Sequence, residues 1–241
     1  MVLSQLVNAV RVALAAAADP ARAPRMQAYM RSTLPYRGVP LPTLRTLVKP
    51  IFESNQMTSF EDWQDTVLGL WRSAEYREER YAAIALTGHR FYRKHQHPGA
   101  IPVYDELVAT GAWWDYVDEV AAHRLGPMLN AYPDALAQTL REWCTDSNLW
   151  RRRGAIISQV LAKSDTDVAL LYACIEPNLE DREFFIRKAI GWALRAYAWT
   201  DPAEVVRFVE AHPKMSGLSR REALRNVPGQ QPARAGTTPH P

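Results

Sequence analysis

Helical periodicity runs through almost the whole chain and constrains the fold more than any other feature of the sequence. Apolar residues recur every three or four positions in most segments, whereas the strict alternation of a half-buried strand is almost absent. In the first segment this spacing is followed by Leu3, Leu6, Val10 and Leu14. Proline stands at several segment starts, where the first turn of a helix tolerates it. The sequence therefore predicts an all-helical protein.

Short links separate the predicted helices, which favours antiparallel packing of neighbours. The helices are expected over residues 2–18, 20–32, 40–54, 59–72, 75–94, 99–110, 113–125, 129–142, 148–162, 166–177, 182–198, 202–211 and 218–226. Asp19-Pro20 and Asp201-Pro202 each predict an N-cap followed by the first residue of a helix. Paired helices of this length indicate an α-solenoid. Because the internal sequence repeat is poor, a compact non-repeating bundle is an open alternative.

The composition limits the class of partner and the kind of site. The chain has 241 residues, 47% of them hydrophobic, which is enough for one large domain or two small ones. Its net charge of +3 is so small that a nucleic-acid surface would require local clustering of basic residues. Cys144 and Cys174 provide neither a metal quartet nor a disulfide framework, and they fit a reducing compartment.

The two ends of the sequence give separate expectations. Residues 12–18 are similar to the apolar core of a signal peptide, but Asn8 and Arg11 interrupt the apolar run. No apolar stretch is long enough to span a bilayer, so we expect a cytosolic protein without membrane association. Residues 228–241 hold no residue larger than Ala that could enter a core, which predicts a disordered tail.

Residues 113–118 concentrate two tryptophans and two carboxylates. If this segment is helical, Trp114 and Asp118 lie one turn apart on the same face. An indole beside a carboxylate is consistent with core packing near the start of a helix. It is equally consistent with an aromatic wall beside an anion, which suits a cationic centre.

Three adjacent arginines, Arg151, Arg152 and Arg153, lie on one predicted helix. Adjacent helical residues point in different directions, so one face cannot carry all three side chains. One interpretation is a solvated face whose arginines pair with carboxylates. The other is that at least one guanidinium contacts a phosphate, whose oxygens match its fork of N–H donors.

A stripe of basic and aromatic residues follows on a later predicted helix. Lys188, Trp192 and Arg195 lie at positions i, i+4 and i+7, and so share one face. A separate buried stripe is expected from Phe184, Phe185, Ala189 and Leu194. A cation–aromatic–cation face suits a polyanion, although a half-buried tryptophan flanked by snorkelling basic side chains is an equal alternative.

Other polar clusters in the sequence give little indication of a metal site or a catalytic site. His95-x-His97 resembles a pair of metal ligands, but no partners follow at a suitable spacing, and we expect an exposed turn. Glu78-Glu79-Arg80 and Asp105-Glu106 are expected on solvated helix faces. The sequence contains no glycine-rich phosphate loop and no Gly-x-Ser-x-Gly motif.

Four motifs in order resemble the AlkD-type DNA alkylation-repair glycosylases, a family of all-helical HEAT-like repeat proteins. They are Trp-Trp-Asp-x-Val-Asp, Leu-Trp-x-Arg-Arg, Phe-Phe-Ile-x-Lys-Ala-Ile-Gly-Trp-x-Leu-Arg-x-Tyr-Ala and Leu-Ser-x-Arg-Glu-Ala-Leu. The likeness extends from about Tyr29 to Val227, and Met26-x-x-Tyr29-Met30 also fits the family. The resemblance implies an α-solenoid of antiparallel helix pairs with a concave basic face, formed as one domain by residues 1–227.

The resemblance also implies an activity and its residues. The family hydrolyses the glycosidic bond of cationic N3- and N7-alkylated purines in duplex DNA. The catalytic carboxylate corresponds to Asp118, the two tryptophans that contact the sugar of the lesion to Trp114 and Trp192, and the bracing arginine to Arg153. The residues expected to contact nucleic acid are Tyr29, Arg151, Arg152, Lys188 and Arg195.

This activity suits a simple site. A cationic purine is already a good leaving group, so the main requirement is an anion beside the positive charge that develops on the sugar. No lysine nucleophile lies within residues 111–118, which predicts monofunctional hydrolysis that leaves an abasic site. We expect no cofactor, no metal and a monomer that associates with the nucleoid when bound to DNA.

Two alternatives remain open from the sequence. The first is a non-catalytic binder of DNA structures on the same scaffold, which would not need Asp118. The second is a protein-interaction solenoid, in which Trp114 and Trp192 would lie in separate cores and the arginines would form a generic surface.

Overall fold

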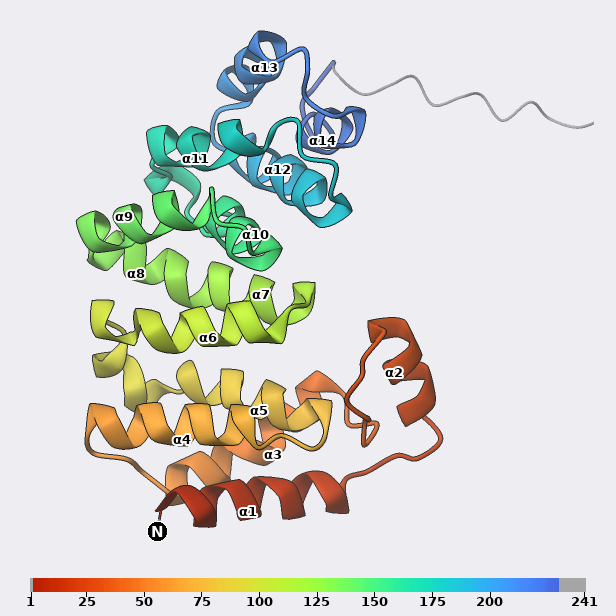
Figure 1. Ribbon diagram of the computed structural model, residues 1–241, viewed down its shortest axis with the longest axis vertical. Coiled ribbons are helices and arrows are strands. Elements are labelled where there is room, and N and C mark those ends of the chain that lie inside the picture. Colours follow the sequence, from red (N-terminus) through yellow and green to blue (C-terminus); the bar gives the residue numbers. More distant parts are fainter. Residues whose placement is uncertain (1, 230–241) are drawn as a thin grey trace, which may run out of the picture. The chain divides into compact units, whose positions relative to one another are not determined.

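The structure is a computed structural model, and it describes residues 2–229, with side chains from residue 5 onward. Over that range the chain forms α-helices, short 3-10 segments and one π-helical turn, and none of these residues forms a strand (Figure 1). The all-helical, helical-repeat class is therefore confirmed. Pro228 and Gly229 lie in a turn, while residues 230–241 of the predicted tail lie outside the described residues.

The chain divides into two compact units between Arg124 and Leu125. The first contains α1 (Val2–Ala16), α2 (Ala23–Met30), α3 (Leu41–Ser54), α4 (Phe60–Arg72), α5 (Arg77–Thr87), α6 (Ile101–Gly111) and α7 (Trp114–Val120). The second contains α8 (Gly126–Ala131), α9 (Pro133–Trp143), α10 (Leu149–Ile157), α11 (Val168–Ile175), α12 (Phe184–Tyr197), α13 (Pro202–Ala211) and α14 (Gly217–Ala223). The single domain expected over residues 1–227 stays a prediction.

The first unit is a stack of helix pairs. Helix α1 packs against α3 and α4, α4 runs beside α5, and α6 packs against α7, while α2 stands to one side of this group (Figure 1). The predicted apolar stripe of α1 is buried at Leu6, Val10 and Leu14. Burial of such a stripe removes apolar surface from water and is the main stabilising contribution to a helical pair.

Two acidic residues of α5 lie in this core rather than on the solvated face that was expected. Glu78 is fully buried. Its carboxylate accepts hydrogen bonds from the backbone N–H groups of Arg37, Gly38 and Val39, at distances of 2.9–3.1 Å. Glu79 is also fully buried and pairs with Arg11 at 3.1 Å. The expectation was wrong because these partners lie about 40 and 68 residues away and leave no periodic signal.

Three predicted helices end or divide at other positions than expected, and the first two have an identifiable reason. The helix expected over 75–94 ends at Thr87, because Gly88 passes against the guanidinium of Arg124, and a 3-10 segment follows at Arg90–His95. The helix expected over 129–142 is divided by Pro133, which starts α9. The helix expected over 148–162 ends at Ile157 and continues as turns.

The second unit is organised around α12, which packs against α10, α13 and α14. Gly191 permits the closest of these approaches. A Cβ atom at this position would lie 3.0 Å from the backbone oxygen of Ser219 and closer than van der Waals contact to Cβ of Glu222. Only a residue without a side chain fits there, so α14 is held directly against the backbone of α12.

Candidate functional site

Helix α7 carries the predicted tryptophan–carboxylate pair. The chain enters it through Ala112, whose φ of 48° is in the left-handed region, and Trp113 is the N-cap residue in extended conformation. Trp114 and Asp118 lie one turn apart on the helix, and both are partly exposed. No side chain caps this helix of seven residues. A helix so short is unstable by itself in water, so tertiary contacts must hold it in place.

Asp115, on the buried side of α7, provides the strongest of those contacts. Its carboxylate accepts hydrogen bonds from Arg77 Nη2 at 2.6 Å and from the Tyr81 hydroxyl. Tyr81 also bonds the hydroxyl of Tyr36 at 2.9 Å. Burial raises the pKa of Asp115, and the interactions with Arg77 and Tyr81 oppose that rise. Burial likewise raises the pKa of Tyr36 to about 12. The network fixes α7 against α5.

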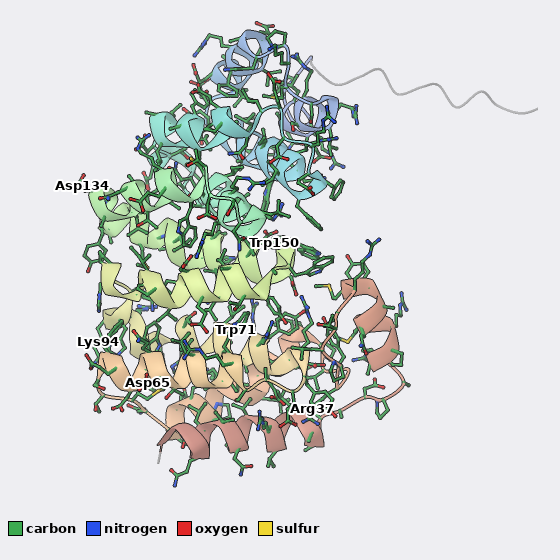
Figure 2. The ribbon with its side chains drawn as sticks, in the orientation of Figure 1. Arg37, Asp65, Trp71, Lys94, Asp134 and Trp150 are labelled. Carbon is green, nitrogen blue, oxygen red and sulfur yellow. The ribbon has the colours of Figure 1, made fainter. Side chains whose placement is uncertain are left out.

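Aromatic packing supports the same face of α7. The ring of Tyr116 lies edge-on to Trp71 of α4, with 5.1 Å between centroids, and the guanidinium of Arg77 lies 4.2 Å from the Tyr116 ring. Trp71, which Figure 2 labels on α4, donates a hydrogen bond to Thr110 at 2.9 Å, and Arg80 lies 4.6 Å from its ring. Helix α7 is therefore fixed by residues from α4, α5 and α6.

A π-helical turn, Ala121–Leu125, follows α7 directly. Within it, Arg124 Nε donates to Thr87 at 2.9 Å, and its guanidinium pairs with Glu119 at 3.5 Å. Glu119 also pairs with Arg45 of α3 at 3.4 Å. Single π-turns inserted in helices are frequent at functional sites, and here the turn begins at the residue after α7.

Tyr29 lies on α2 and is 76% exposed. Helix α2 contains no acidic residue, and Arg25 on the helix and Arg31 at its C-cap are both exposed. Arg22, just before the helix, pairs with Asp19 at 3.4 Å. An exposed tyrosine beside exposed arginines is suited to contact a phosphate backbone.

The three adjacent arginines of α10 are all engaged within the second unit. Arg151 pairs with Asp146 at 3.2 Å. Arg152 donates to the backbone oxygen of Asp146 at 2.8 Å and pairs with Asp181 at 3.1 Å. Arg153 is 5% exposed and donates to the backbone oxygen of Phe185 at 2.7 Å. The interpretation of a face whose arginines pair with carboxylates therefore describes Arg151 and Arg152. Both hold the loop before α10, and Arg152 also holds the loop before α12.

Both cations of the basic stripe of α12 pair with one carboxylate from α14. Lys188 pairs with Glu222 at 3.1 Å, and Arg195 pairs with the other oxygen of the same carboxylate. Burial raises the pKa of Glu222, but hydrogen bonds from the two cations outweigh it and hold that pKa below its ordinary value of 4.5. Trp192, between the two cations, is partly exposed. In the neighbouring stripe Ala189 and Leu194 are buried as expected.

Phe184 does not join that buried stripe as expected, because it is the first residue of α12 and is 58% exposed. Trp199 is a surface residue that the sequence analysis missed. It is 75% exposed, lies two positions after the end of α12, and lines the same cavity as Trp192 and Arg195. Extending the spacing of Lys188, Trp192 and Arg195 by one more step would have found it.

The described residues contain neither a cluster of metal ligands nor a membrane-spanning helix. Among residues 2–229 no cluster of three or more His, Cys, Asp or Glu side chains could hold a metal ion. None of the helices in that range is long and apolar enough to cross a bilayer. His95 is buried against Trp63 and Tyr92 instead of lying in an exposed turn, and burial lowers its pKa.

Comparisons with known proteins point to one family. The family model described as "DNA alkylation repair enzyme" matches residues 10–227. A solved structure described as a predicted DNA alkylation repair enzyme from Enterococcus faecalis is similar, with a TM-score of 0.77 and 27% sequence identity. The similarity covers 88% of this chain and 97% of the other. The search of curated proteins gave no match.

Proposed function

The chain belongs to the family of DNA alkylation repair enzymes, and from that premise we propose that it is a monofunctional DNA glycosylase. Family membership gives it a role in DNA alkylation repair, with DNA as the partner. The finer proposal is hydrolysis of the N-glycosidic bond of cationic N3- or N7-alkylated purines in duplex DNA. The products are the free base and an abasic site.

The observation that carries the proposal is the construction of α7. Asp115 is committed to the buried network with Arg77 and Tyr81, and this network fixes the rotation of the helix. Trp114 and Asp118 lie one turn apart on that fixed helix and are partly exposed. A carboxylate held in position before the reaction stabilises developing positive charge without reorganisation during the reaction, which is the most effective form of electrostatic catalysis.

The proposed chemistry assigns one role to each residue. The C1′–N bond breaks, and its electron pair moves to the purine and neutralises the positive charge of the base. Asp118 stabilises the positive charge that develops on the sugar and orients the attacking water, whose oxygen bonds C1′ as a proton is released. Trp114 and Trp192 contribute cation–π attraction of about 1–2 kcal/mol each where water is excluded. Arg153 braces the site.

Binding is proposed to depend mainly on the phosphate backbone. Exposed Tyr29 on α2 and the basic residues Lys188 and Arg195 on α12 would position the duplex, with further contacts from Arg151 and Arg152. Such contacts fix register but read no sequence, so affinity should fall steeply with salt. The enzyme is proposed to act as a monomer in the cytosol, at the nucleoid, without a cofactor.

The test is release of 7-methylguanine from methylated duplex DNA by the wild type and by Asp118→Asn. This substitution is nearly isosteric, and we expect it to slow release by about 100-fold or more while DNA binding persists, because it removes one preorganised charge. Glu119→Gln is the matched control, since it removes a neighbouring carboxylate of the same helix that pairs with Arg45 and Arg124. It should retain release within a few-fold.

Each result is decisive for the assignment. Equal release by the wild type and Asp118→Asn would remove the carboxylate from the mechanism. DNA binding without any release would make the protein a non-catalytic binder of DNA structures. Rapid release of uracil, a neutral base, would contradict selection of lesions by their positive charge. Strand incision at the abasic site would contradict monofunctional hydrolysis.

A further inference from the structure

Trp199 and Leu161 form an unusual apolar surface in the second unit. Trp199 follows the end of α12 and is 75% exposed, and Leu161, in the turns after α10, is 53% exposed. Exposed large apolar side chains that gather in one place mark a binding surface for a ligand or a partner. The catalytic proposal does not use either residue.

These two residues line the same cavity as Trp192. The cavity has a volume of about 350 Å³, within the range of small-ligand sites. Its lining residues are Val160, Leu161, Lys163, Trp192, Arg195, Ala196, Trp199 and Thr200. Two indoles, a leucine, a valine and an alanine thus provide its apolar surface, and its charged lining residues are a lysine and an arginine.

The charges of the cavity distinguish between classes of ligand. None of the described side chains that line it is acidic. Lys163 is exposed, and lysine is depleted at protein–protein interfaces, which argues against a protein partner. Aromatic faces flanked by cations are the usual surface for an unpaired nucleotide, because every base has a face that stacks and every phosphate is anionic.

We propose that this cavity binds one unstacked nucleobase of the DNA partner, with the indole of Trp199 as its stacking surface. Lys163 and Arg195 would attract the flanking phosphates. The inference rests on DNA being the partner, as in the proposed function, and adds a subsite for a base outside the duplex stack. It predicts tighter binding to DNA with an unpaired nucleotide than to fully paired DNA.

The experiment compares two DNA duplexes of the same sequence. One carries a single bulged 2-aminopurine, and the other is fully paired with 2-aminopurine in the stack. We expect the full-length wild type to bind the bulged duplex about tenfold more tightly and to quench its fluorescence, as stacking on an indole does. Trp199→Ala should abolish both the preference and the quenching, while Trp199→Phe should retain most of each.

Two further variants separate stacking on Trp199 from the loss of any exposed aromatic side chain and from the loss of a cation. Tyr132→Ala removes another exposed aromatic side chain of the second unit and should leave the preference unchanged. Lys163→Gly removes a cation at a φ of 54°, a conformation that glycine adopts without strain, so it should fold normally and reduce the preference by a few-fold. An unchanged thermal unfolding midpoint of each variant confirms that the fold is intact.

The outcomes separate this inference from the proposed function. If the wild type releases 7-methylguanine from paired DNA but shows no preference for the bulge, the subsite is wrong and the glycosylase stands. If the preference is present and depends on Trp199 but no base is released, the subsite stands alone. Equal loss of bulged and paired binding in Trp199→Ala would overturn the nucleobase assignment, and absence of all DNA binding would overturn both proposals.

Discussion

Helices α7 and α12 each present a tryptophan among charged residues, yet they are held in opposite ways. On α7 the helix supplies the carboxylate of Asp115, and its buried partner Arg77 comes from α5. On α12 the helix supplies the cations, and the carboxylate of Glu222 comes from α14. The first ion pair has side chains only 6% and 13% exposed, whereas Lys188 in the second is 37% exposed.

The difference shows which helix depends on charge and which on backbone contact. A helix of seven residues without a side-chain cap has little intrinsic stability, so α7 requires its buried network. Helix α12 has 14 residues, and its fit against α14 depends on the absence of a side chain at Gly191. The charges of α12 can therefore change with little effect on the fold, whereas the buried charge of Asp115 on α7 cannot.

The largest effect is expected from Asp115→Ala, which leaves the buried guanidinium of Arg77 without its carboxylate. Removing one partner of a buried ion pair costs about 3–5 kcal/mol of unfolding free energy. Urea unfolding of the two proteins measures the change. The matched control is Asp65→Ala, an exposed carboxylate of α4, which should change stability by less than about 0.5 kcal/mol (Figure 2). Equal losses in both variants would mean that the network does not stabilise α7.

An intermediate effect is expected from Gly191→Ala. The added methyl group would meet Ser219 and Glu222 at less than van der Waals distance, and overpacking of this kind costs about 1–3 kcal/mol. Gly217→Ala is the control, because the only atom near its Cβ is the mobile end of Arg221. The control should be neutral or slightly stabilising in thermal unfolding. A stable Gly191→Ala would show that α14 is not held by backbone proximity.

The smallest effect is expected from Glu222→Gln, and it should depend on pH. Because the pKa of Glu222 is below its ordinary value of 4.5 in the folded state, its charge stabilises the fold above that value. The contribution is lost as the pH falls through the lower folded value. At pH 7 the variant should be less stable by about 1 kcal/mol, and the difference should shrink as the pH falls below the ordinary pKa of 4.5 and through the lower folded value.

Unfolding of the wild type, Glu222→Gln and the exposed control Glu210→Gln across this pH range tests the prediction. The control should differ little from the wild type at any pH. A stability difference for Glu222→Gln that is the same at pH 7 and pH 3 would show that the charge is not the cause. The same variant frees Lys188 and Arg195, so it should bind DNA more tightly than the wild type.

The sequence predicted correctly those helices and spacings that depend on contacts between residues close in the chain. Helix α13 covers the predicted residues 202–211, because Asp201 caps it by accepting from the N–H of Glu204 at 2.8 Å and Pro202 begins it. The spacing of Trp114 and Asp118 on one helix was predicted in the same way, from periodicity alone. The catalytic role of that pair stays a prediction.

Long-range contacts account for what the sequence did not predict. Asp19-Pro20 has the same N-cap pattern as Asp201-Pro202, yet the helix starts only at Ala23. The side chain of Asp19 accepts from the backbone N–H groups of Ala21 and Arg22, as an N-cap does, but three residues of turn follow it before the helix begins. Its own backbone N–H donates to the backbone oxygen of Arg37, a long-range contact that ties Asp19 to the loop between α2 and α3. The partners of Glu222 were equally invisible, because no periodic pattern links α12 to a residue of α14.

The carboxylate of Glu78 gives the loop before α3 an unexpected kinetic property. Loop amides normally exchange their hydrogens with solvent quickly, because no helix or sheet protects them. Here the amides of Arg37, Gly38 and Val39 all donate to one fully buried side chain. They can exchange only when α5 moves away from them, so this loop should retain its hydrogens as long as the helical core and report the opening of α5 directly.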